Sequence, residues 1–591
     1  MPSEIYNRVD YKLENMLLDI ESGKMGLPDL QRPFVWSNNK VRDLLDSMML
    51  GYPLGFVMLW DAPEDDGKNR LIGTDGHQHQ APKQLIIDGQ QRLTSLYAVM
   101  YGKEIVDSKF RKKKIKIAYH PIDRKFEGSK NSLRKSPEWI GDISEAYENE
   151  SNSYDYVNNF ISNLAEARQK EGKELTSEEK EKISKGISAL FGLKKYQIPT
   201  LTITDAADEE DVAEIFKRVN SGGKALNEND FILTLISVHN EQERRRIEKF
   251  CESATIPAKS GTAYNQLFEP NASHIVRATM AFGFKRARLR YAYMILRGKD
   301  MDTGEYSTEL REKKFDELSE YLDKVLDLNN WHEFINCVLS AGYLSKSLIS
   351  SENALVYTYV MYLLGKYDFK VEAPVLRRTI ARWFYMVSIT SYYTGSYEAD
   401  VQQDLNNIAL LNTAEQFEAY INNKVKSTFT NDYFNITLPA DLDTSSSTAP
   451  VWNAYCAAQN VLNVKALFST LRVRELYAPG SSGTRSSVEK HHLWPKEYLP
   501  TIGFKDDRER NQAANFAFIE WKDNSDISAG APADYWPVMT ASFSEDVLKE
   551  MMYDNAIPEN WTSMTYPDFL EKRRVLMAGV IRRGYETLLE S

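Results

Sequence analysis

The sequence predicts a multidomain α+β protein, and three patterns along its 591 residues lead to this prediction. Residues 1–240 alternate short apolar runs, typical of buried strands, with segments of helical period. Residues 241–450 carry mostly helical patterns with short loops, rich in Leu, Tyr and Phe. Residues 451–591 hold a strand-like run that ends in two adjacent histidines and a helical C-terminal segment. We therefore expect an α+β domain, a helical connector and a smaller α+β module with flanking helices.

The composition is that of a globular protein without a membrane partner. Hydrophobic residues make up 42% of the chain and charged residues 27%, and the mean hydropathy is -0.48. We find no apolar run long enough to span a bilayer. The three cysteines are far apart and odd in number, which argues against a disulfide framework and against a thiolate zinc site. A cytoplasmic location fits these observations.

The net charge of -11 argues against a protein that coats nucleic acid through general positive charge. Any DNA contact has to come from local basic patches, and two stand out, at residues 285–290 and 377–383. Basic helical clusters interleaved with aromatic residues suit contact with a DNA backbone. In an acidic chain of this size, faces neutralised by salt bridges are an equally good interpretation.

The first sixty residues are expected to alternate helices with extended segments. The patterns predict helices over 11–20 and 38–50 and a strand over 55–60. Two prolines keep residues 27–36 extended. This extended segment presents Gln31 and Arg32 beside two aromatic residues.

A strand, a glycine turn and a helix follow one another at residues 84–100. The apolar run 84–87 predicts a buried strand, Asp88-Gly89 breaks it, and residues 90–100 read as a helix. The turn places backbone N–H groups at a helix start beside a carboxylate and Arg92, which is a ready site for an anion such as phosphate. An ordinary strand-to-helix connection with a capping Asp explains the spacing equally well.

The remainder of the N-terminal region is predicted to be helical with short strands. We expect strands over 114–118 and 198–203, and charged helical structure over 150–195 in which Thr176 is a helix N-cap.

A second polar loop follows the helix predicted over 205–219. Two glycines end this helix, and Arg218 and Asn220 project at its end. Such a loop could close over a ligand held at Asp88. A plain helix C-cap explains the glycines but does not require the arginine.

A second group of chemically active residues lies near residue 490. His491 and His492 end a strand-like run, and Asn515 and Asn524 follow. A hairpin followed by a helix start would bring both histidines and Asn524 within reach of one metal. Oxygen and imidazole ligands suit Mg²⁺ or Mn²⁺ ahead of Zn²⁺. One histidine could ligate the metal while its neighbour, on the opposite strand face, deprotonates water. A pair of structural histidines is the alternative.

This C-terminal region resembles the HNH (ββα-metal) nucleases. The matching residues are His491-His492, Trp494-Pro495, Asn515 and Asn524. The resemblance implies that His492 is the general base, that His491 and Asn524 hold a divalent metal, and that Asn515 pins the loop that orients the base. Many relatives carry Asp where His491 stands, so Glu489 is expected to supply the missing carboxylate.

The N-terminal region, in turn, resembles the DGQQR-motif domain with a ParB/sulfiredoxin-like core. Three segments carry the resemblance in the family's order, at residues 30–36, 87–94 and 216–223. The resemblance implies a nucleoside-triphosphate site in which Asp88 and Arg92 also take part in catalysis. The residues implied to bind the nucleotide are Gln31, Arg32, Asp88, Gly89, Gln90, Gln91, Arg92, Arg218 and Asn220.

Taken together, the two ends resemble the fused GmrSD-type modification-dependent restriction endonucleases and the related SspE-type phage-defence effectors. The implied domains are a nucleotide-binding domain at 1–240, a helical connector at 241–450 and an HNH nuclease domain at 451–591. The implied activity is an endonuclease or nickase that needs Mg²⁺ or Mn²⁺ and GTP or ATP, hydrolyses the nucleotide, and cleaves modified phage DNA. The expected partners are double-stranded DNA, the nucleotide and a second copy of the chain.

A non-catalytic alternative stays open at this point. His491 in place of Asp is compatible with a degenerate HNH fold that only grips DNA, in a nucleotide-gated regulatory protein. An enzyme that acts on RNA is neither supported nor excluded by the sequence.

Overall fold

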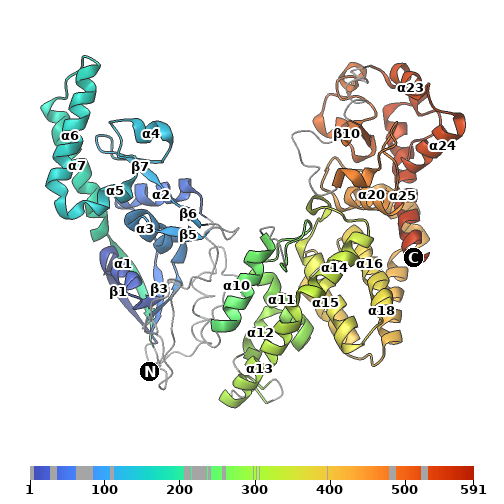
Figure 1. The fold of residues 1–591 in the computed structure, drawn as a ribbon, viewed down its shortest axis with the longest axis horizontal. Helices are drawn as coiled ribbons and strands as arrows, with labels where there is room; N and C mark the ends of the chain where they lie inside the picture. Colours follow the sequence, from blue (N-terminus) through green and yellow to red (C-terminus); the bar gives the residue numbers. More distant parts are fainter. Residues whose placement is uncertain are drawn as a thin grey trace. The chain divides into compact units, whose positions relative to one another are not determined.

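The computed structural model describes residues 5–26, 36–61, 84–106, 112–204, 215, 236, 241–255, 261–296, 298–300, 303–304, 307–395, 397–477, 488–520 and 530–590. The chain divides into two compact units, residues 1–234 and 235–591. The first unit is mixed α+β and the second is mostly helical (Figure 1). The predicted class, a multidomain α+β protein, is confirmed.

The N-terminal unit is built on a mixed five-stranded sheet. Its elements are β1 (Tyr6–Lys12), α1 (Leu13–Glu21), β2 (Met25–Gly26), α2 (Asn38–Met49), β3 (Val57–Asp61), β4 (Gln84–Asp88), α3 (Gln90–Tyr101), β5 (Glu104–Val106), β6 (Lys112–Lys114), β7 (Ile117–His120), β8 (Lys125–Gly128), α4 (Asn131–Lys135), α5 (Ile143–Glu148), α6 (Ser153–Lys170), α7 (Ser177–Gly192) and β9 (Gln197–Ile203).

The strand order of this sheet is β1-β9-β3-β4-β2. The outer pair β1–β9 and the pair β3–β4 are antiparallel, whereas β9–β3 and β4–β2 are parallel. The central strands β3 and β4 are therefore hydrogen-bonded on both sides. Asp88 is the last residue of β4, so it stands at the end of a strand whose position is fixed from both sides.

The apolar stripes of α1, α2 and α3 account for the main core of this unit. Leu17 of α1, Leu45 of α2 and Leu96 of α3 are all fully buried in one cluster with Leu59 and Ile86 of the sheet. Residues spaced three and four apart share a helix face, so each helix turns one apolar face to the core. This packing holds α3 against the sheet directly after Asp88.

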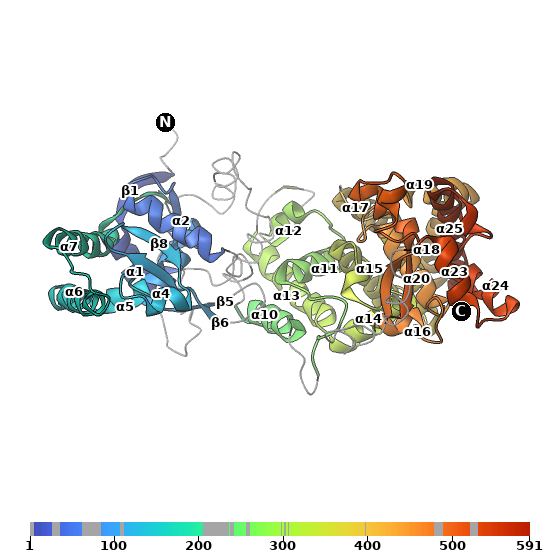
Figure 2. The same cartoon turned by 90° about the horizontal axis from the view of Figure 1, so that it is seen from above.

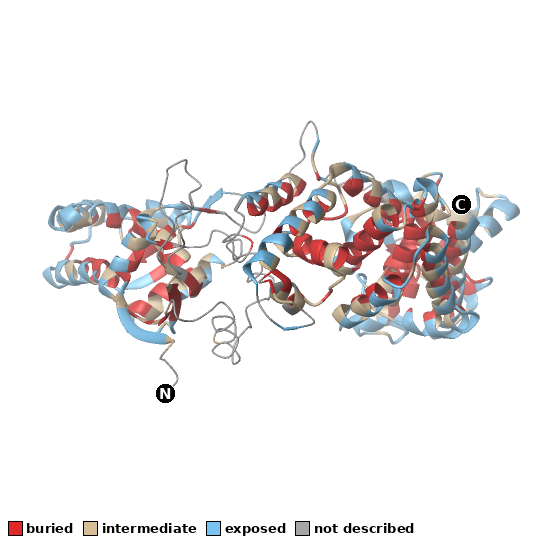
Figure 3. Ribbon diagram, turned by 90° about the horizontal axis from the view of Figure 1, so that it is seen from below, coloured by how far each residue is buried: buried red, intermediate tan, exposed pale blue. Residues whose placement is uncertain are grey.

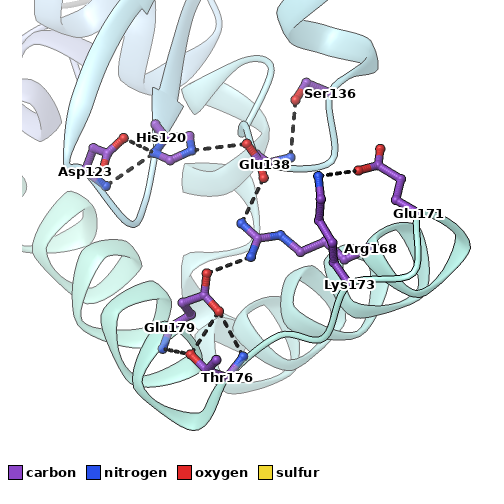
Figure 4. Close-up of polar contacts among 9 residues, drawn as sticks. All are labelled: His120, Asp123, Ser136, Glu138, Arg168, Glu171, Lys173, Thr176 and Glu179. Carbon is purple, nitrogen blue, oxygen red and sulfur yellow. Dashed lines mark hydrogen bonds and ion pairs between the residues drawn. The ribbon is translucent and has the colours of Figure 1, made fainter.

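The helices α6 and α7 lie side by side and are joined to the rest of the unit by a polar network (Figures 1, 2 and 4). Arg168 donates to Glu138 at 2.9 Å and to Glu179 at 2.6 Å. Glu179 also closes a capping box with Thr176, which confirms the predicted N-cap. The backbone N–H of Thr176, followed by the Arg168 guanidinium, lowers the pKa of Glu179 to about 2.

Within its described residues, the second unit contains many helices and one pair of short strands. Its elements are α10 (Glu241–Thr255), α11 (Ala272–Phe284), α12 (Leu289–Leu296), α13 (Thr308–Val325), α14 (Leu328–Ser340), α15 (Glu352–Leu363), α16 (Ala373–Thr390), α17 (Tyr397–Ile408), α18 (Ala414–Thr428), α19 (Leu438–Asp441), α20 (Pro450–Val461), η6 (Val473–Tyr477), β10 (Val488–His492), α21 (Asp507–Arg510), η8 (Ala513–Asn515), β11 (Phe516–Glu520), α23 (Pro532–Thr540), α24 (Glu545–Asp554) and α25 (Tyr566–Glu590).

The inner helices α15, α16 and α20 form the core of the second unit. In α15 every residue from Ala354 to Leu363 is buried, and in α20 the same holds from Val451 to Asn460. A helix that is buried on all sides is typical of the interior of a large domain. Figure 3 shows these buried positions along the inner helices, with exposed residues on the outer ones.

A fully buried arginine joins α25 to the strand pair. Arg573 donates to the carbonyl oxygen of Ala514 at 2.7 Å, to that of Ala556 at 3.2 Å and to that of Asn555 at 3.3 Å. Its side chain is 0% exposed. Burial lowers the pKa of this guanidinium, because the charged form loses its hydration. Carbonyl dipoles take the place of water around the charge.

Several predicted elements agree closely with the observed ones. The helix expected over 38–50 is α2, the strand and helix of 84–100 are β4 and α3, and the strand over 198–203 is β9. The helix expected to start at residue 11 begins instead at Leu13, because β1 runs through Lys12 to pair with β9. The strand expected over 114–118 is split between β6 and β7.

Of the two predicted domain boundaries, at residues 240 and 450, one lies near the division between the two compact units. The boundary predicted at 240 lies close to the division at residue 234, whereas the boundary predicted at 450 lies within the second unit, at the start of α20. The three-domain division stays a prediction. Within the described residues, the longest and most apolar helices fall short of what a membrane span requires.

We predict that Arg573→Met lowers the stability of the second unit. Methionine has a similar length but no donor, so three buried carbonyl groups lose a partner at a cost of about 3 kcal/mol or more. The thermal unfolding midpoint, followed by circular dichroism, should fall by several degrees. Lys572→Met, at the exposed neighbouring position of the same helix, should leave the midpoint nearly unchanged. Equal midpoints for both variants would contradict this role of Arg573.

Candidate functional site

The first candidate site lies at the turn between β4 and α3. Gly89 has a φ of +94°, a backbone conformation that favours glycine. A Cβ atom at this position would lie 2.8 Å from Cγ2 of Val57 and 3.3 Å from Nη2 of Arg92. Glycine is therefore required here both by the backbone conformation and by the space that its neighbours occupy.

Arg92, on the first turn of α3, is bound to the backbone that leads into β3. Its Nη2 atom donates to the carbonyl oxygen of Phe56 at 2.7 Å and to Oδ2 of Asp88 at 3.3 Å, and its Nη1 atom donates to the carbonyl oxygen of Leu54. Burial lowers the pKa of Arg92, and the charge of Asp88 opposes that shift. The guanidinium thus fixes the loop before β3 against the start of α3.

A second glycine leaves room for the same guanidinium. Gly55 has a φ of +80°, and a Cβ atom there would lie 2.9 Å from Nη1 of Arg92. The two glycines, Gly55 and Gly89, therefore border the Arg92 side chain on two sides. In this structure Arg92 is a positioning residue, with much of its donor capacity directed at the chain itself.

Asp88 keeps contact with solvent at this turn. Its side chain is 34% exposed, compared with 19% for Arg92. The pairing of β3 with β4 shifts register between Met58 and Leu59, opposite the end of β4, and such irregularities often re-aim a side chain. Gln90 donates to the carbonyl oxygen of Ile86 at 2.8 Å. A carboxylate of this kind can accept hydrogen bonds from a ribose or ligate a cation that accompanies phosphate.

The other loops of the predicted nucleotide pocket cannot be compared with the structure. Gln31, Arg32, Arg218 and Asn220 lie outside the described residues. Asp88, Gly89 and Arg92 are brought together, and Gln90 and Gln91 follow on the same helix turn. The three-loop pocket stays a prediction.

The second candidate site lies on the strand pair of the second unit. Strands β10 and β11 are antiparallel, with His491 opposite Ala517 and His492 opposite Phe516. Leu467 adds a short parallel bridge to Ile519. Successive side chains of a strand point to opposite faces, so the two histidines are directed to different surroundings.

His492 contacts an amide, Asn511, that follows the histidine pair in the sequence and for which no role was predicted from the sequence. Its Nε2 atom lies 3.0 Å from Oδ1 of Asn511, and its ring lies 4.6 Å from that of Phe516. Because an amide oxygen only accepts hydrogen bonds, Nε2 carries the proton and Nδ1 keeps a lone pair. A polar amide four residues before Asn515 was the one sequence signal that could have pointed to Asn511.

The surroundings of His492 favour its neutral form. Burial lowers the pKa of His492 most, and the positive charges of Lys496, Lys490 and Arg510 lower it further, while the hydrogen bond with Asn511 acts in the opposite direction. A neutral imidazole near pH 7 can accept a proton, as a general base must.

Asn515 holds the loop that follows the two histidines. It is 0% exposed. Its Oδ1 atom accepts from the N–H of Trp494 at 2.8 Å, and its Nδ2 atom donates to the carbonyl oxygen of Trp494 at 3.0 Å and to that of Arg510 at 3.2 Å. The backbone carbonyl of Asn515 accepts from Leu493. These contacts hold the loop after the two histidines, and the role of Asn515 in orienting the base stays a prediction.

The predicted metal ligands are only partly covered by the structure. His491 is 7% exposed and its ring lies 6.4 Å from that of Tyr535, whereas His492 is directed to Asn511. Asn524 and the side chain of Glu489 lie outside the described residues. Among the described residues there is no group of three His, Cys, Asp or Glu side chains placed to hold a metal.

The chain is similar to a known family model over its N-terminal part and to a relative over most of its length. Residues 13–237 match a family model described as the GmrSD restriction endonuclease, N-terminal domain. This range includes all of the predicted nucleotide loops. Over 556 residues, 87% of this chain and 84% of the relative, the chain is 20% identical to the uncharacterized protein MJ0686 of Methanocaldococcus jannaschii.

We predict that Lys496→Gln raises the pKa of His492. The lysine charge disfavours the imidazolium, so its removal should move the pKa upward, toward the ordinary histidine value. The pKa can be followed by NMR of protein labelled at its eight histidines. Lys505→Gln, at an exposed position outside the groups that shift His492, is the control and should leave the titration unchanged. A downward shift in Lys496→Gln would contradict this electrostatic interpretation.

Proposed function

We propose that this chain is a DNA endonuclease of a restriction-like defence system, with a nucleoside-triphosphate site in its N-terminal unit and the cleavage site on the β10–β11 strand pair. The family match of residues 13–237 supports the restriction endonuclease context. The proposed cleavage chemistry rests on the environment of His492. This histidine is half-buried, its pKa is lowered, and its Nε2 atom contacts Asn511. Modified phage DNA is the proposed substrate.

In the proposed reaction, His492 acts as the general base. Its Nδ1 atom takes a proton from water, and the water oxygen forms a bond to phosphorus. The P–O bond to the leaving strand breaks, and its electron pair goes to the leaving oxygen. Asn511 keeps the imidazole in the tautomer that leaves Nδ1 able to accept the proton. Asn515 positions the loop beside the base through Trp494.

A divalent cation, Mg²⁺ or Mn²⁺, belongs to this proposal through the resemblance to HNH nucleases. The described donors by themselves do not form a metal site, because His491 and His492 face different surroundings. Glu489 and Asn524 are the proposed oxygen ligands, with His491 as the imidazole ligand.

The N-terminal site is proposed to bind GTP or ATP and to couple its hydrolysis to cleavage. Asp88 would contact the cation that accompanies the triphosphate, and the uncapped start of α3 would face a phosphate. Arg92 would keep the loop before β3 in place. The loops of Gln31, Arg32, Arg218 and Asn220 are proposed to complete the pocket.

A second candidate function is a nucleotide-gated DNA-binding protein with a degenerate HNH fold. The observation that favours it is His491, which stands where many members of the resembled family carry Asp. Isothermal titration calorimetry with Mg²⁺ and Mn²⁺ separates the two functions. A nuclease should bind one of these ions at a specific site, and Glu489→Ala should weaken that binding; a degenerate site should show no specific heat.

We predict that His492→Ala strongly slows DNA cleavage. Loss of a general base should lower the rate roughly 100- to 10,000-fold. The assay uses matched unmodified, glucosylated hydroxymethylcytosine and phosphorothioate DNA, with Mg²⁺ or Mn²⁺ and with or without GTP or ATP. His332→Ala, at an exposed histidine of the same unit, is the control and should cut as the wild type does.

The pH dependence gives a second readout of the same base. The base acts when neutral, so activity should rise with pH through the pKa of His492 and level off above it. Since that pKa is lowered, the acid limb should lie below the ordinary histidine value. Full-rate cleavage by His492→Ala would show that the nuclease assignment is wrong.

We predict that Asp88→Ala weakens nucleotide binding and hydrolysis. Loss of a charged contact should cost roughly tenfold or more in affinity, measured by equilibrium binding of fluorescent GTP and ATP analogues and by phosphate release. Asp155→Ala, at an exposed position of α6, is the control. If Asp88→Ala binds and hydrolyses both nucleotides as the wild type does, the nucleotide site is not at this turn.

A further inference from the structure

Two cavities in the second unit lie along neighbouring stretches of α16 and α25. The larger has a volume of about 630 Å³ and the smaller of about 420 Å³. Arg377 and Arg378 of α16 line the first, and Arg382, one turn further along, lines the second. The C-terminal end of α25 contributes to both, and Arg382 donates to the carbonyl oxygen of Leu588 at 3.5 Å. The cavities are therefore neighbouring hollows along one pair of helices.

The lining of these cavities is strongly basic. Six cations and two carboxylates border them, an excess of four positive charges in a chain whose net charge is -11. Glu333 and Glu586 are the carboxylates. We call this lining the α16 basic surface, and its cations are Arg377, Arg378, Arg382, Lys426, Arg474 and Arg582.

Arg582 pairs with Glu586 at 2.9 Å, but other cations of this lining lack a carboxylate partner among the described residues. Arg377 lies 4.0 Å from Glu333, at the limit of an ion pair. No ion pair joins Arg378 or Arg474 to a carboxylate within the part of the chain that the structure describes. The Nε atom of Arg382 is buried without a hydrogen-bond partner there, and the charge of Arg378 helps to lower the pKa of Arg382, after burial.

In the other basic cluster of the sequence, the first cation is paired with a carboxylate. Lys285, at the start of residues 285–290, lies 2.7 Å from Asp368 and also donates to the carbonyl oxygen of Phe282. Its charge is therefore neutralised by a neighbouring helix end. The cluster on α16 combines cations that lack a carboxylate partner among the described residues with cavities that these cations line.

We propose that the α16 basic surface binds the phosphate backbone of DNA. Arginine forks match phosphate oxygens in pairs, and their attraction is strengthened where a hollow shields them from water. Two cavities in a row along α16 suit successive phosphates of a polymer better than a single small ligand. The inference rests on the proposed function for the identity of the polymer, and the contacts would position DNA without reading its sequence.

The α16 basic surface is also connected to the candidate cleavage site. Arg474 belongs to η6, which packs against β10. At the other side, α25 runs from Tyr566, which donates to the backbone of Glu509 near the histidines, to the end that lines both cavities. DNA held on the α16 basic surface would therefore be bound by the same rigid elements that position His492.

The test compares DNA binding by full-length variants in a His492→Ala background. Arg378→Ala/Arg474→Ala is measured by fluorescence anisotropy with an unmodified duplex of about three helical turns, over about 50–200 mM salt. We expect affinity to fall roughly 10- to 100-fold at about 0.1 M salt, and the slope of log K against log salt to become shallower by about 1.8, or 0.9 per lost phosphate contact. Arg378→Lys/Arg474→Lys keeps both charges and should retain most of the binding.

Arg311→Ala/Lys313→Ala is the matched control, because it removes two positive charges from α13 in the same unit. Equal loss in the control, or unchanged binding in Arg378→Ala/Arg474→Ala, overturns the inference. Loss of GTP or ATP binding with intact DNA binding also overturns it, in favour of a small-nucleotide pocket. Cleavage by the parent protein reports separately on the proposed function, because a chain that binds DNA through this surface but never cuts it contradicts only the nuclease assignment.

Discussion

The geometry of the strand pair depends on a positive charge buried away from any described carboxylate. A guanidinium taken out of water costs several kcal/mol unless polar groups replace its hydration. Arg573 meets this requirement with carbonyl groups from two separate segments, at Ala514 and at Asn555–Ala556. Because Ala514 directly precedes Asn515, the same interaction that satisfies the charge also fixes the amide that holds the loop after His492. The packing of α25 and the geometry of the candidate site therefore depend on the same interaction.

In the N-terminal unit, too, an arginine side chain donates to backbone carbonyl groups at the candidate site. Arg92 directs its donors to carbonyl groups at Leu54 and Phe56, and two glycines leave the space that its guanidinium needs. A motif that suggests phosphate binding in the sequence is thus partly a folding element. The two roles are compatible, because a turn that must hold a ligand has to be rigid before the ligand arrives.

The parts of the fold that depend on local sequence were predictable. The strand–turn–helix of residues 84–100 and the cap at Thr176 follow from patterns within a few residues, and both are observed. The carbonyl partners of Arg92 lie 36 and 38 residues away in the chain, and β1 becomes a strand only through pairing with β9. Such contacts depend on tertiary packing and leave no periodic signal. For the same reason Asn511 was not selected, although its amide sets the tautomer of His492.

The cations around His492 have two effects on the proposed chemistry. One weakens His492 as a base, and the other favours the approach of a phosphate. Lys490, Lys496 and Arg510 lower its pKa together with burial, which keeps the imidazole neutral but also makes it a weaker base. The same charges attract a phosphate, and a bound phosphodiester would offset part of their field and raise the pKa again. The base would then become stronger when DNA is present. In an acidic chain, a small group of cations of this kind gives a local positive field that the chain as a whole lacks.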